Sequence, residues 1–461
     1  MTIDEAALGV FASAFRGQLI RPGDASYDEA RSVWNGMIDR RPALIARCAD
    51  AADVAGAVRF ARDHDVVASV RGGGHSAAGK AVCDAGIVID LSTMRGVQVD
   101  PDAETARAEG GARWGDYDQA TQSFGLASPG GVVSTTGIAG LTLGGGFGWL
   151  TRRFGLACDN LRSVDLVLAD GELVTASEDE NTDLFWGVRG GGGNFGIATS
   201  FEYRVHPVGP LILGALLAWP LERGPEILRV YREFVADLPE ELGIEAMFVT
   251  APPLPFIPED MHFKPAIATG MCWSGPVDDG RKVMAPLLDL DPPGQMVEAM
   301  PYTVMQSLQD GLAPPGRRSY WKAGYLKGLG DDIIESVVAH AANVPSPFSL
   351  AEIVRWGGAT ARVGKDETAF GNREAPFLFN AVSMWEGAEG DDANVAWARD
   401  FYTAVGSELT EGVYVNFLSD EGDARVREAY GPEKYARLAS LKAKYDADNF
   451  FRSNQNIDPG G

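Results

Sequence analysis

Three glycine-rich segments constrain what this chain can fold into more than any other part of its sequence. They are RGGGHS at residues 71–76, a longer run at residues 130–148, and GGGNFG at residues 191–196. Glycine lets a backbone approach a ligand closely, and runs of free backbone N–H groups can bind an anion. Because all three segments fall within about 130 residues, they favour a region that wraps one large ligand over a set of unrelated turns.

Two of these segments match nucleotide-binding patterns, and both matches fail on their context. Residues 74–80, GHSAAGK, fit most of the phosphate loop of nucleoside triphosphatases, but Ala81 stands where a Ser or Thr would ligate magnesium. Residues 191–196 fit GxGxxG, but a helix-like run precedes them and a strand-like run follows, which reverses the Rossmann order. The nearest acidic candidate for binding a ribose is Glu222. An ATPase and a Rossmann protein are therefore disfavoured.

Hydrophobic periodicity predicts helices and strands around the glycine-rich segments. We expect a helix at 53–64, strands at 66–70 and 86–92, a hairpin at 165–177, a short helix at 181–190 and a strand at 197–205. Asp170-Gly171 is a strong signal for the turn of that hairpin. The strand at 66–70 leads directly into RGGGHS.

Beyond His206 the glycine content falls and the pattern changes. We expect strands at 211–219, 266–273, 319–326 and 376–385, and helices at 226–235, 331–340 and 393–405. This pattern predicts a second domain in which helices cover one side of a sheet. The chain as a whole is therefore predicted to have an α+β fold.

Composition argues against several classes of partner. The chain has 40 Lys and Arg against 64 Asp and Glu, and its net charge of −24 would repel nucleic acid and anionic membranes. Its four cysteines form no CxxC pair and have no histidine at zinc spacing, so we expect neither a disulfide framework nor a metal site. The first residues lack a basic leader, and no window of about 18 apolar residues occurs. We therefore expect a cytoplasmic protein.

Six motifs together resemble one known family. They are RGGGHS (71–76), the glycine run at 137–148, GLACDN (155–160), DLFWGVRGGGGNFGI (183–197), YVNF (414–417) and DADNFFRSNQNI (446–457). The chain resembles, over essentially its full length, the berberine-bridge-enzyme-like branch of the FAD-linked oxidases that share the vanillyl-alcohol-oxidase or PCMH-type FAD domain. Each motif is weak alone, but the combination is specific.

The resemblance implies an architecture and an activity. The FAD-binding domain would comprise residues 1–205 and 415–461, and a substrate domain, residues 206–414, would place an antiparallel sheet covered by helices over the flavin. Such an enzyme passes hydride from a C–H next to an alcohol or amine of a small organic substrate to flavin N5, and O2 then accepts the electrons to give H2O2. A flavin-binding dehydrogenase and a non-catalytic flavin- or ligand-binding protein are the alternatives. The molecule would be a monomer or homodimer.

The resemblance also implies how the cofactor is held. His75 would form an 8α-histidyl bond to FAD, and Val133 stands where many relatives carry a second, cysteinyl attachment, so a single covalent bond is expected. Thr136 occupies the place where the family sets oxygen access. The implied cofactor-binding residues are Arg71, Gly72, Gly73, Gly74, His75, Ser76, Val133, Ser134, Thr135, Thr136, Gly137, Gly140, Gly145, Gly148, Ile197, Tyr414, Asn416 and Asn454.

The catalytic base is not evident from the sequence. Plant relatives carry a tyrosine where this chain has Phe417, and phenylalanine cannot accept a proton. The candidates to replace it are Tyr414 and the polar residues on strands of the second domain, namely Asn380, Tyr320, Lys322 and Arg355. Because neighbouring residues of a strand face opposite sides of the sheet, half of such residues face away from any site. Reduction without a base stays open as an alternative.

Overall fold

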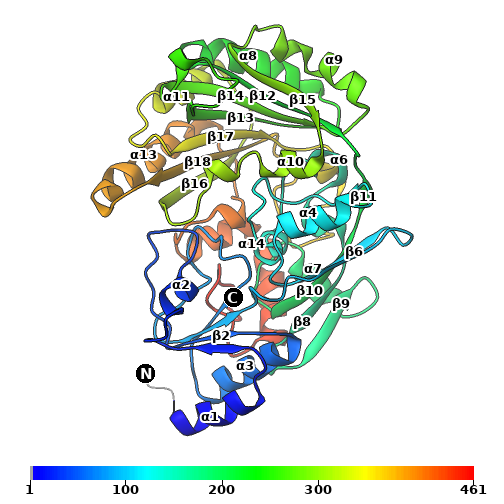
Figure 1. The fold of residues 1–461 in the computed structure, drawn as a ribbon, viewed down its shortest axis with the longest axis vertical. Coiled ribbons are helices and arrows are strands. Elements are labelled where there is room, and N and C mark those ends of the chain that lie inside the picture. The colour runs from blue at the N-terminus through cyan, green and yellow to red at the C-terminus, as the bar shows by residue number, and fades with distance from the viewer. Residues whose placement is uncertain (1–3, 461) are drawn as a thin grey trace.

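The computed structural model describes residues 4–460, which form helices and four β-sheets (Figure 1). The predicted α+β fold is confirmed. In Figure 1 the largest sheet and its helices occupy the upper part of the molecule, and two smaller sheets lie below them. Every helix within residues 4–460 is too short or too polar to cross a membrane.

The first sheet positions the RGGGHS segment. Its strand order is β1-β2-β4-β3, and β4 runs parallel to both β2 and β3. The strands are β1 (Gln18–Ile20), β2 (Leu44–Arg47), β3 (Ala68–Arg71) and β4 (Ile87–Asp90). Helix α3 (Ala51–Asp63) joins β2 to β3 and begins after Asp50, whose carboxylate accepts hydrogen bonds from two backbone N–H groups of the first turn. The glycine-rich segment begins where β3 ends.

The second sheet is antiparallel, with the order β5-β6-β10-β8-β9. Its strands are β5 (Val97–Asp100), β6 (Thr105–Glu109), β8 (Leu161–Val167), β9 (Leu173–Ser177) and β10 (Ile197–Arg204). The predicted hairpin is β8–β9, and the turn contains Gly171 at φ +81°. Glycine adopts this left-handed backbone without the strain that other residues would suffer.

Short helices and a two-stranded pair surround these sheets. They are α1 (Glu5–Ala14), α2 (Tyr27–Arg31), α4 (Trp114–Gln122), α5 (Ile138–Leu143), α6 (Thr151–Phe154), α7 (Thr182–Val188), β7 (Leu126–Ala127) and β11 (His206–Pro207). Helix α5 begins at Ile138, directly after Gly137, inside the second glycine-rich segment.

The largest sheet is antiparallel and has the order β15-β12-β14-β13-β17-β18-β16. Its strands are β12 (Ile212–Pro220), β13 (Leu242–Thr250), β14 (Pro265–Trp273), β15 (Gly294–Met300), β16 (Arg318–Leu326), β17 (Leu350–Arg355) and β18 (Phe377–Trp385). One face packs on α8 (Gly224–Phe234), α9 (Val277–Leu288), α11 (Asp331–Ala341) and α13 (Asp391–Ala404), as predicted (Figure 1). The other face lies against residues of the glycine-rich half, including Phe147 and Tyr414.

The end of the chain returns to the first half of the molecule. Helix α14 (Asp423–Tyr445) packs beside α7 (Figure 1). The fully buried ammonium of Lys442 is paired with Asp446 and donates to the backbone carbonyls of Asn194 and Phe451. A buried charge is tolerated when it is paired and hydrogen-bonded in this way. These contacts fix residues 446–455 next to the third glycine-rich segment.

A buried acid at the contact between α4 and α10 (Tyr302–Ser307) makes stability depend on pH. Burial raises the pKa of Asp118 to about 7, although a hydrogen bond from Gln306 opposes that shift. Between about pH 4 and pH 7 the carboxyl of Asp118 is ionised in the unfolded chain but still protonated in the folded protein. Raising the pH through this range therefore destabilises the folded state. Asp118→Asn should therefore raise stability by roughly 2–4 kcal/mol at pH 8 and have little effect at pH 4.

Thermal unfolding at the two pH values checks this expectation. Asp63→Asn, on the exposed end of α3, is the matched control and should behave like the wild-type protein at both pH values. A stabilisation by Asp118→Asn that is equal at pH 4 and pH 8 would contradict the assignment.

Candidate active site

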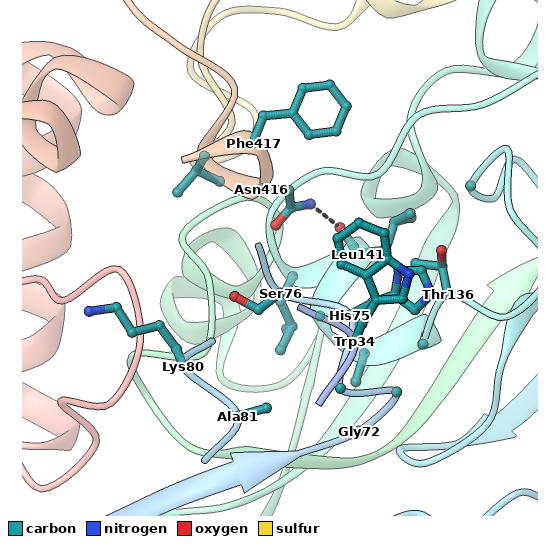
Figure 2. Close-up of a pocket in the computed structure, with 18 of the residues that line it drawn as sticks. Trp34, Gly72, His75, Ser76, Lys80, Ala81, Thr136, Leu141, Asn416 and Phe417 are labelled. Carbon is teal, nitrogen blue, oxygen red and sulfur yellow. Dashed lines mark hydrogen bonds between the residues drawn. The ribbon is translucent and has the colours of Figure 1, made fainter. Parts of the chain in front are cut away.

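A cavity of about 370 Å³ lies between the glycine-rich segments and the largest sheet (Figure 2). Each glycine-rich segment contributes to its wall, and so do residues between 414 and 418 and between 451 and 455 near the end of the chain. Five strands or loops that are far apart in sequence thus meet around one space. The three glycine-rich segments therefore surround one space, as their clustering predicts.

The RGGGHS segment forms one wall of the cavity as a backbone cradle. Within residues 4–460, the backbone N–H groups of residues 72–76 have no hydrogen-bond acceptor. The loop also touches the second glycine-rich segment so closely that a Cβ on Gly73 would lie 2.4 Å from the nitrogen of Gly137. Only glycine fits such an approach. Free N–H groups on a loop of this kind suit the phosphates of a nucleotide cofactor.

Further polar atoms in the wall lack a partner. The Oγ of Ser69, Oδ1 of Asn454 and Oδ1 of Asn380 are buried without a hydrogen bond to any residue of 4–460, and all three residues line the cavity. Buried polar atoms are normally paired, so these atoms indicate a ligand with both donors and acceptors. FAD, which carries a pyrophosphate, a ribityl chain and a flavin ring, matches this wall chemically.

His75 is held between two side chains. Its Nε2 lies 3.0 Å from Oγ1 of Thr135. Its ring stacks on the indole of Trp34, with centroids 5.3 Å apart (Figure 2). Burial, together with the positive charge of Arg113, lowers the pKa of His75 to about 4. The imidazole is therefore neutral at pH 7, and one ring nitrogen keeps a lone pair.

The sheet side of the cavity carries a carboxyl group that the sequence analysis missed. Glu352 on β17 lines the cavity and is 9% exposed, and its Oε1 accepts a hydrogen bond of 3.0 Å from Nδ2 of Asn380 on β18. A second buried carboxyl, Glu245 on β13, accepts a hydrogen bond from Gln309. Burial raises the pKa of both carboxyls, and the charge of Glu352 raises that of Glu245 further.

Tyr414 and Phe417 complete the wall near the second glycine-rich segment. The hydroxyl of Tyr414 accepts hydrogen bonds from the backbone N–H of Gly146 and from Nδ2 of Asn416, which also donates to the carbonyl of Leu141 (Figure 2). Burial raises the pKa of Tyr414. Its hydroxyl therefore supports the loop structure, and the aromatic ring of Phe417 adds only apolar surface.

Most of the residues predicted to bind the cofactor lie on the cavity wall. They are Gly72, Gly73, Gly74, His75, Ser76, Val133, Thr136, Gly137, Gly140, Ile197, Tyr414, Asn416 and Asn454. Five others lie outside it, namely Arg71, Ser134, Thr135, Gly145 and Gly148.

These five residues support the wall from behind. The guanidinium of Arg71 donates to the backbone carbonyls of Ala30 and Ser32. Ser134 bonds to Asp310, and Thr135 lies behind His75. A Cβ on Gly145 would meet Phe370 and one on Gly148 the carbonyl of Gly130, so both glycines allow close packing.

The structure places Asn380 in the cavity but not Tyr320, Lys322 or Arg355. Ala323 pairs with Asn380 across the β16–β18 ladder, so residues of odd number on β16 share its face and residues 320 and 322 point to the opposite one. There Tyr320 accepts a hydrogen bond from Arg399 of α13, and Lys322 pairs with Glu421. Neither side chain reaches the cavity. Arg355 likewise donates to two backbone carbonyls away from it.

Comparison with known proteins identifies the class of this protein and the family to which it belongs. Residues 42–177 match the family described as "FAD binding domain", and residues 413–458 match "Berberine and berberine like". The protein is therefore a FAD-dependent oxidoreductase. It belongs to the berberine-like FAD-linked oxidoreductases, because (R)-6-hydroxynicotine oxidase of Paenarthrobacter nicotinovorans is 31% identical over 97% of this chain and 98% of its own.

Other relatives agree with this family. An uncharacterised FAD-linked oxidoreductase of Bacillus subtilis is 30% identical and covers 96% of this chain and 97% of its own. The crystal structure of 6-hydroxy-D-nicotine oxidase from Arthrobacter nicotinovorans superposes with a TM-score of 0.87 at 29% identity, covering 96% of this chain and 98% of its own. Xylooligosaccharide oxidase from Myceliophthora thermophila gives a TM-score of 0.86 at 25% identity, covering 98% and 99%. The family and the FAD cofactor predicted from sequence are confirmed.

Proposed function

We propose that this enzyme is an oxidase that takes hydride from a C–H bond next to an alcohol or amine of a small, largely apolar substrate. Bound FAD supplies the hydride acceptor, and O2 accepts the electrons and leaves as H2O2. The observation that carries this proposal is the carboxyl of Glu352, buried in the sheet wall across the cavity from the glycine cradle.

Glu352 has the properties of a general base. Its raised pKa brings the carboxyl closer to neutral pH, where a base is both deprotonated and able to accept a proton. Asn380 donates to Oε1 and orients the carboxyl toward the proton of a substrate hydroxyl or ammonium group. This pair supplies the proton acceptor that Phe417 cannot provide.

The remaining wall indicates what kind of substrate fits. Beside the carboxyl and amide, the sheet side presents Met247, Trp321, Leu350 and Val382 to the cavity. These side chains favour an apolar or aromatic body with one polar reacting group. In this proposal residues 206–414 form the substrate domain, and residues 1–205 and 415–461 hold the cofactor.

We also propose one covalent bond between FAD and His75. The half-buried, neutral imidazole on the cavity wall supports this attachment, because the free lone pair can act as a nucleophile. All four cysteines lie buried outside the wall, and Val133 lines it at the position where the family resemblance implies a second, cysteinyl attachment in many relatives. A second attachment is therefore not expected.

Two measurements test this function. Under nitrogen, a panel of aromatic and aliphatic alcohols and amines should include compounds that bleach the flavin absorbance, and air should restore it with release of H2O2. Bleaching that an artificial acceptor but not O2 reverses would identify a dehydrogenase. Absence of bleaching by the whole panel would favour a non-catalytic flavin protein.

A further inference from the structure

One loop of the large-sheet region hydrogen-bonds to Trp34, which stacks on His75, and to Ser134, which precedes Thr135. This loop, residues 310–316, begins with a short 3₁₀ turn (Asp310–Leu312) after α10 and leads into β16; we call it the bridging loop. It lies far in sequence from the glycine-rich segments, yet it hydrogen-bonds to residues next to His75 from two directions. The segments that would cradle the cofactor are thus supported partly by the large-sheet region.

The first direction runs through the second glycine-rich segment. Oδ1 of Asp310 accepts a hydrogen bond of 2.8 Å from the backbone N–H of Ser134, and Oδ2 accepts one of 2.6 Å from the Ser134 hydroxyl. The next residue is Thr135, whose Oγ1 lies 3.0 Å from Nε2 of His75. Asp310 therefore fixes the backbone that presents the Thr135 hydroxyl to the imidazole.

The second direction runs through Trp34. Its indole N–H donates to the carbonyl of Ala313, and its backbone carbonyl accepts from the N–H of Gly316. The backbone N–H of Trp34 in turn donates to the carbonyl of Gly74, the residue before His75. With its indole stacked on the imidazole, Trp34 is fixed on one side by the bridging loop and on the other by the cradle.

We infer that the bridging loop positions the imidazole of His75 for bond formation with the cofactor, with Asp310 and Thr135 as positioning residues. This inference rests on the covalent attachment proposed above. In this arrangement Nε2–H of His75 donates to Oγ1 of Thr135, which leaves the lone pair on Nδ1 as the nucleophile. Neither Thr135 nor Asp310 lines the cavity, so both act through His75 and not on the cofactor.

The bond-forming step balances with O2 as the oxidant. Nδ1 of His75 forms a bond to the 8α-methyl carbon of the flavin, the methyl group loses one C–H hydrogen, and the imidazole gives up its N–H proton. The electron pair and both hydrogens pass to O2, which leaves as H2O2. Thr135 accepts the hydrogen bond from Nε2–H while Nδ1 attacks, and afterwards the ring stays neutral.

The first test replaces the hydroxyl next to His75. Thr135→Val keeps the side-chain volume and removes the hydrogen bond, whereas Thr135→Ser restores it. Full-length protein produced without riboflavin is mixed with FAD in air, and intact-mass spectrometry follows the covalent adduct with time. We expect Thr135→Val to slow adduct formation about 10- to 100-fold, as misplaced reacting groups do. Thr135→Ser and the control Thr403→Val, exposed on α13, should react at the wild-type rate.

The second test reaches the same histidine from the bridging loop. Asp310→Ala should slow the adduct in the same way, and Asp332→Ala, exposed on α11, serves as its control. If Asp310→Ala fails to fold by circular dichroism, Ser134→Ala removes one of the two bonds and should give a smaller slowing. Non-covalent FAD affinity, measured by quenching of flavin fluorescence, should change little in every variant.

The outcomes separate this inference from the proposed attachment. No adduct in the wild-type protein would refute the covalent bond itself. A wild-type adduct together with unchanged rates in Thr135→Val and in the Asp310 or Ser134 variant would refute the positioning role. Equal loss of adduct and of non-covalent affinity would also refute it, because such a loss indicates a collapsed cradle.

Discussion

Replacing Glu352 with glutamine should lower the rate of flavin reduction by substrate about 10²- to 10⁴-fold. Glutamine keeps the volume of the side chain and can still accept a hydrogen bond from Asn380, but it cannot take a proton at neutral pH. Stopped-flow absorbance under nitrogen measures the reduction step directly. Glu298→Gln, exposed on the edge strand β15 of the same sheet, is the matched control and should react at the wild-type rate.

The pH dependence gives a second signature of the same base. Glu352 must be deprotonated to act, so the wild-type rate should fall as the pH drops through its pKa. Because burial raises that pKa above the ordinary 4.5, the fall should begin closer to neutral pH. The Glu352→Gln profile should lack this step. An unchanged rate in Glu352→Gln would show that the substrate gives up its hydride without this base.

Replacing His75 with alanine should abolish covalent flavin completely. Wild-type protein precipitated with acid should give a yellow pellet, with the mass of FAD on the peptide that contains His75. The His75→Ala pellet should be colourless and the supernatant yellow, since the free N–H groups of residues 72–76 still hold FAD without the bond. We also expect slower reduction, because loss of the imidazole substituent makes the flavin a weaker oxidant.

The control for this variant is His64→Ala, which removes an exposed histidine at the end of α3. Its pellet should stay yellow. If the His75→Ala pellet retained colour, the flavin would be attached at another residue. If the wild-type pellet were colourless, the proposed covalent bond would be refuted. The backbone cradle and the assignment of the protein to its family would not be affected.

The fold was largely predictable because most elements carry a clear local pattern. The helix at 53–64, the Asp170-Gly171 hairpin and the strands at 319–326 and 376–385 all appear within a few residues of the expected positions. Strand β13 (Leu242–Thr250) was missed: like β18 it is buried over most of its length and shows no alternation, but Gly243 and the charged Glu245 also interrupt its apolar run. Burial of that kind depends on the neighbouring layers, which a local pattern does not contain.

The sequence predicted residues of the cavity wall correctly where a sequence motif or strand position also faces the cavity in the structure. Residues 72–76 and Asn380 lie on the cavity wall, whereas Tyr320 and Lys322 lie on the helix-facing side of β16. Tyrosine and lysine are reasonable residue types for an active site. The face of the sheet on which they lie, however, depends on the register of β16 with its neighbouring strand. Glu352 could have been found by the same logic, because an isolated glutamate between alanine and isoleucine in a buried strand is an unusual choice.

Thr135 shows a different limit of motif reasoning. It lies inside a cofactor-binding segment, but its hydroxyl contacts His75 from behind the wall. Membership of a segment therefore does not separate residues that touch the cofactor from residues that hold those contacts in place. Only the spatial arrangement of Thr135, Ser134 and Asp310 makes that distinction.

The return of the C-terminal segment has a consequence for biosynthesis. Asn454 lines the cavity and donates to the carbonyl of Gly193, and Phe451 lies on the same wall. While the ribosome is still making these residues, the space that receives the flavin has an open side. We therefore expect stable cofactor capture to follow release of this segment from the ribosome, and nascent chains stalled before it should emerge without pigment.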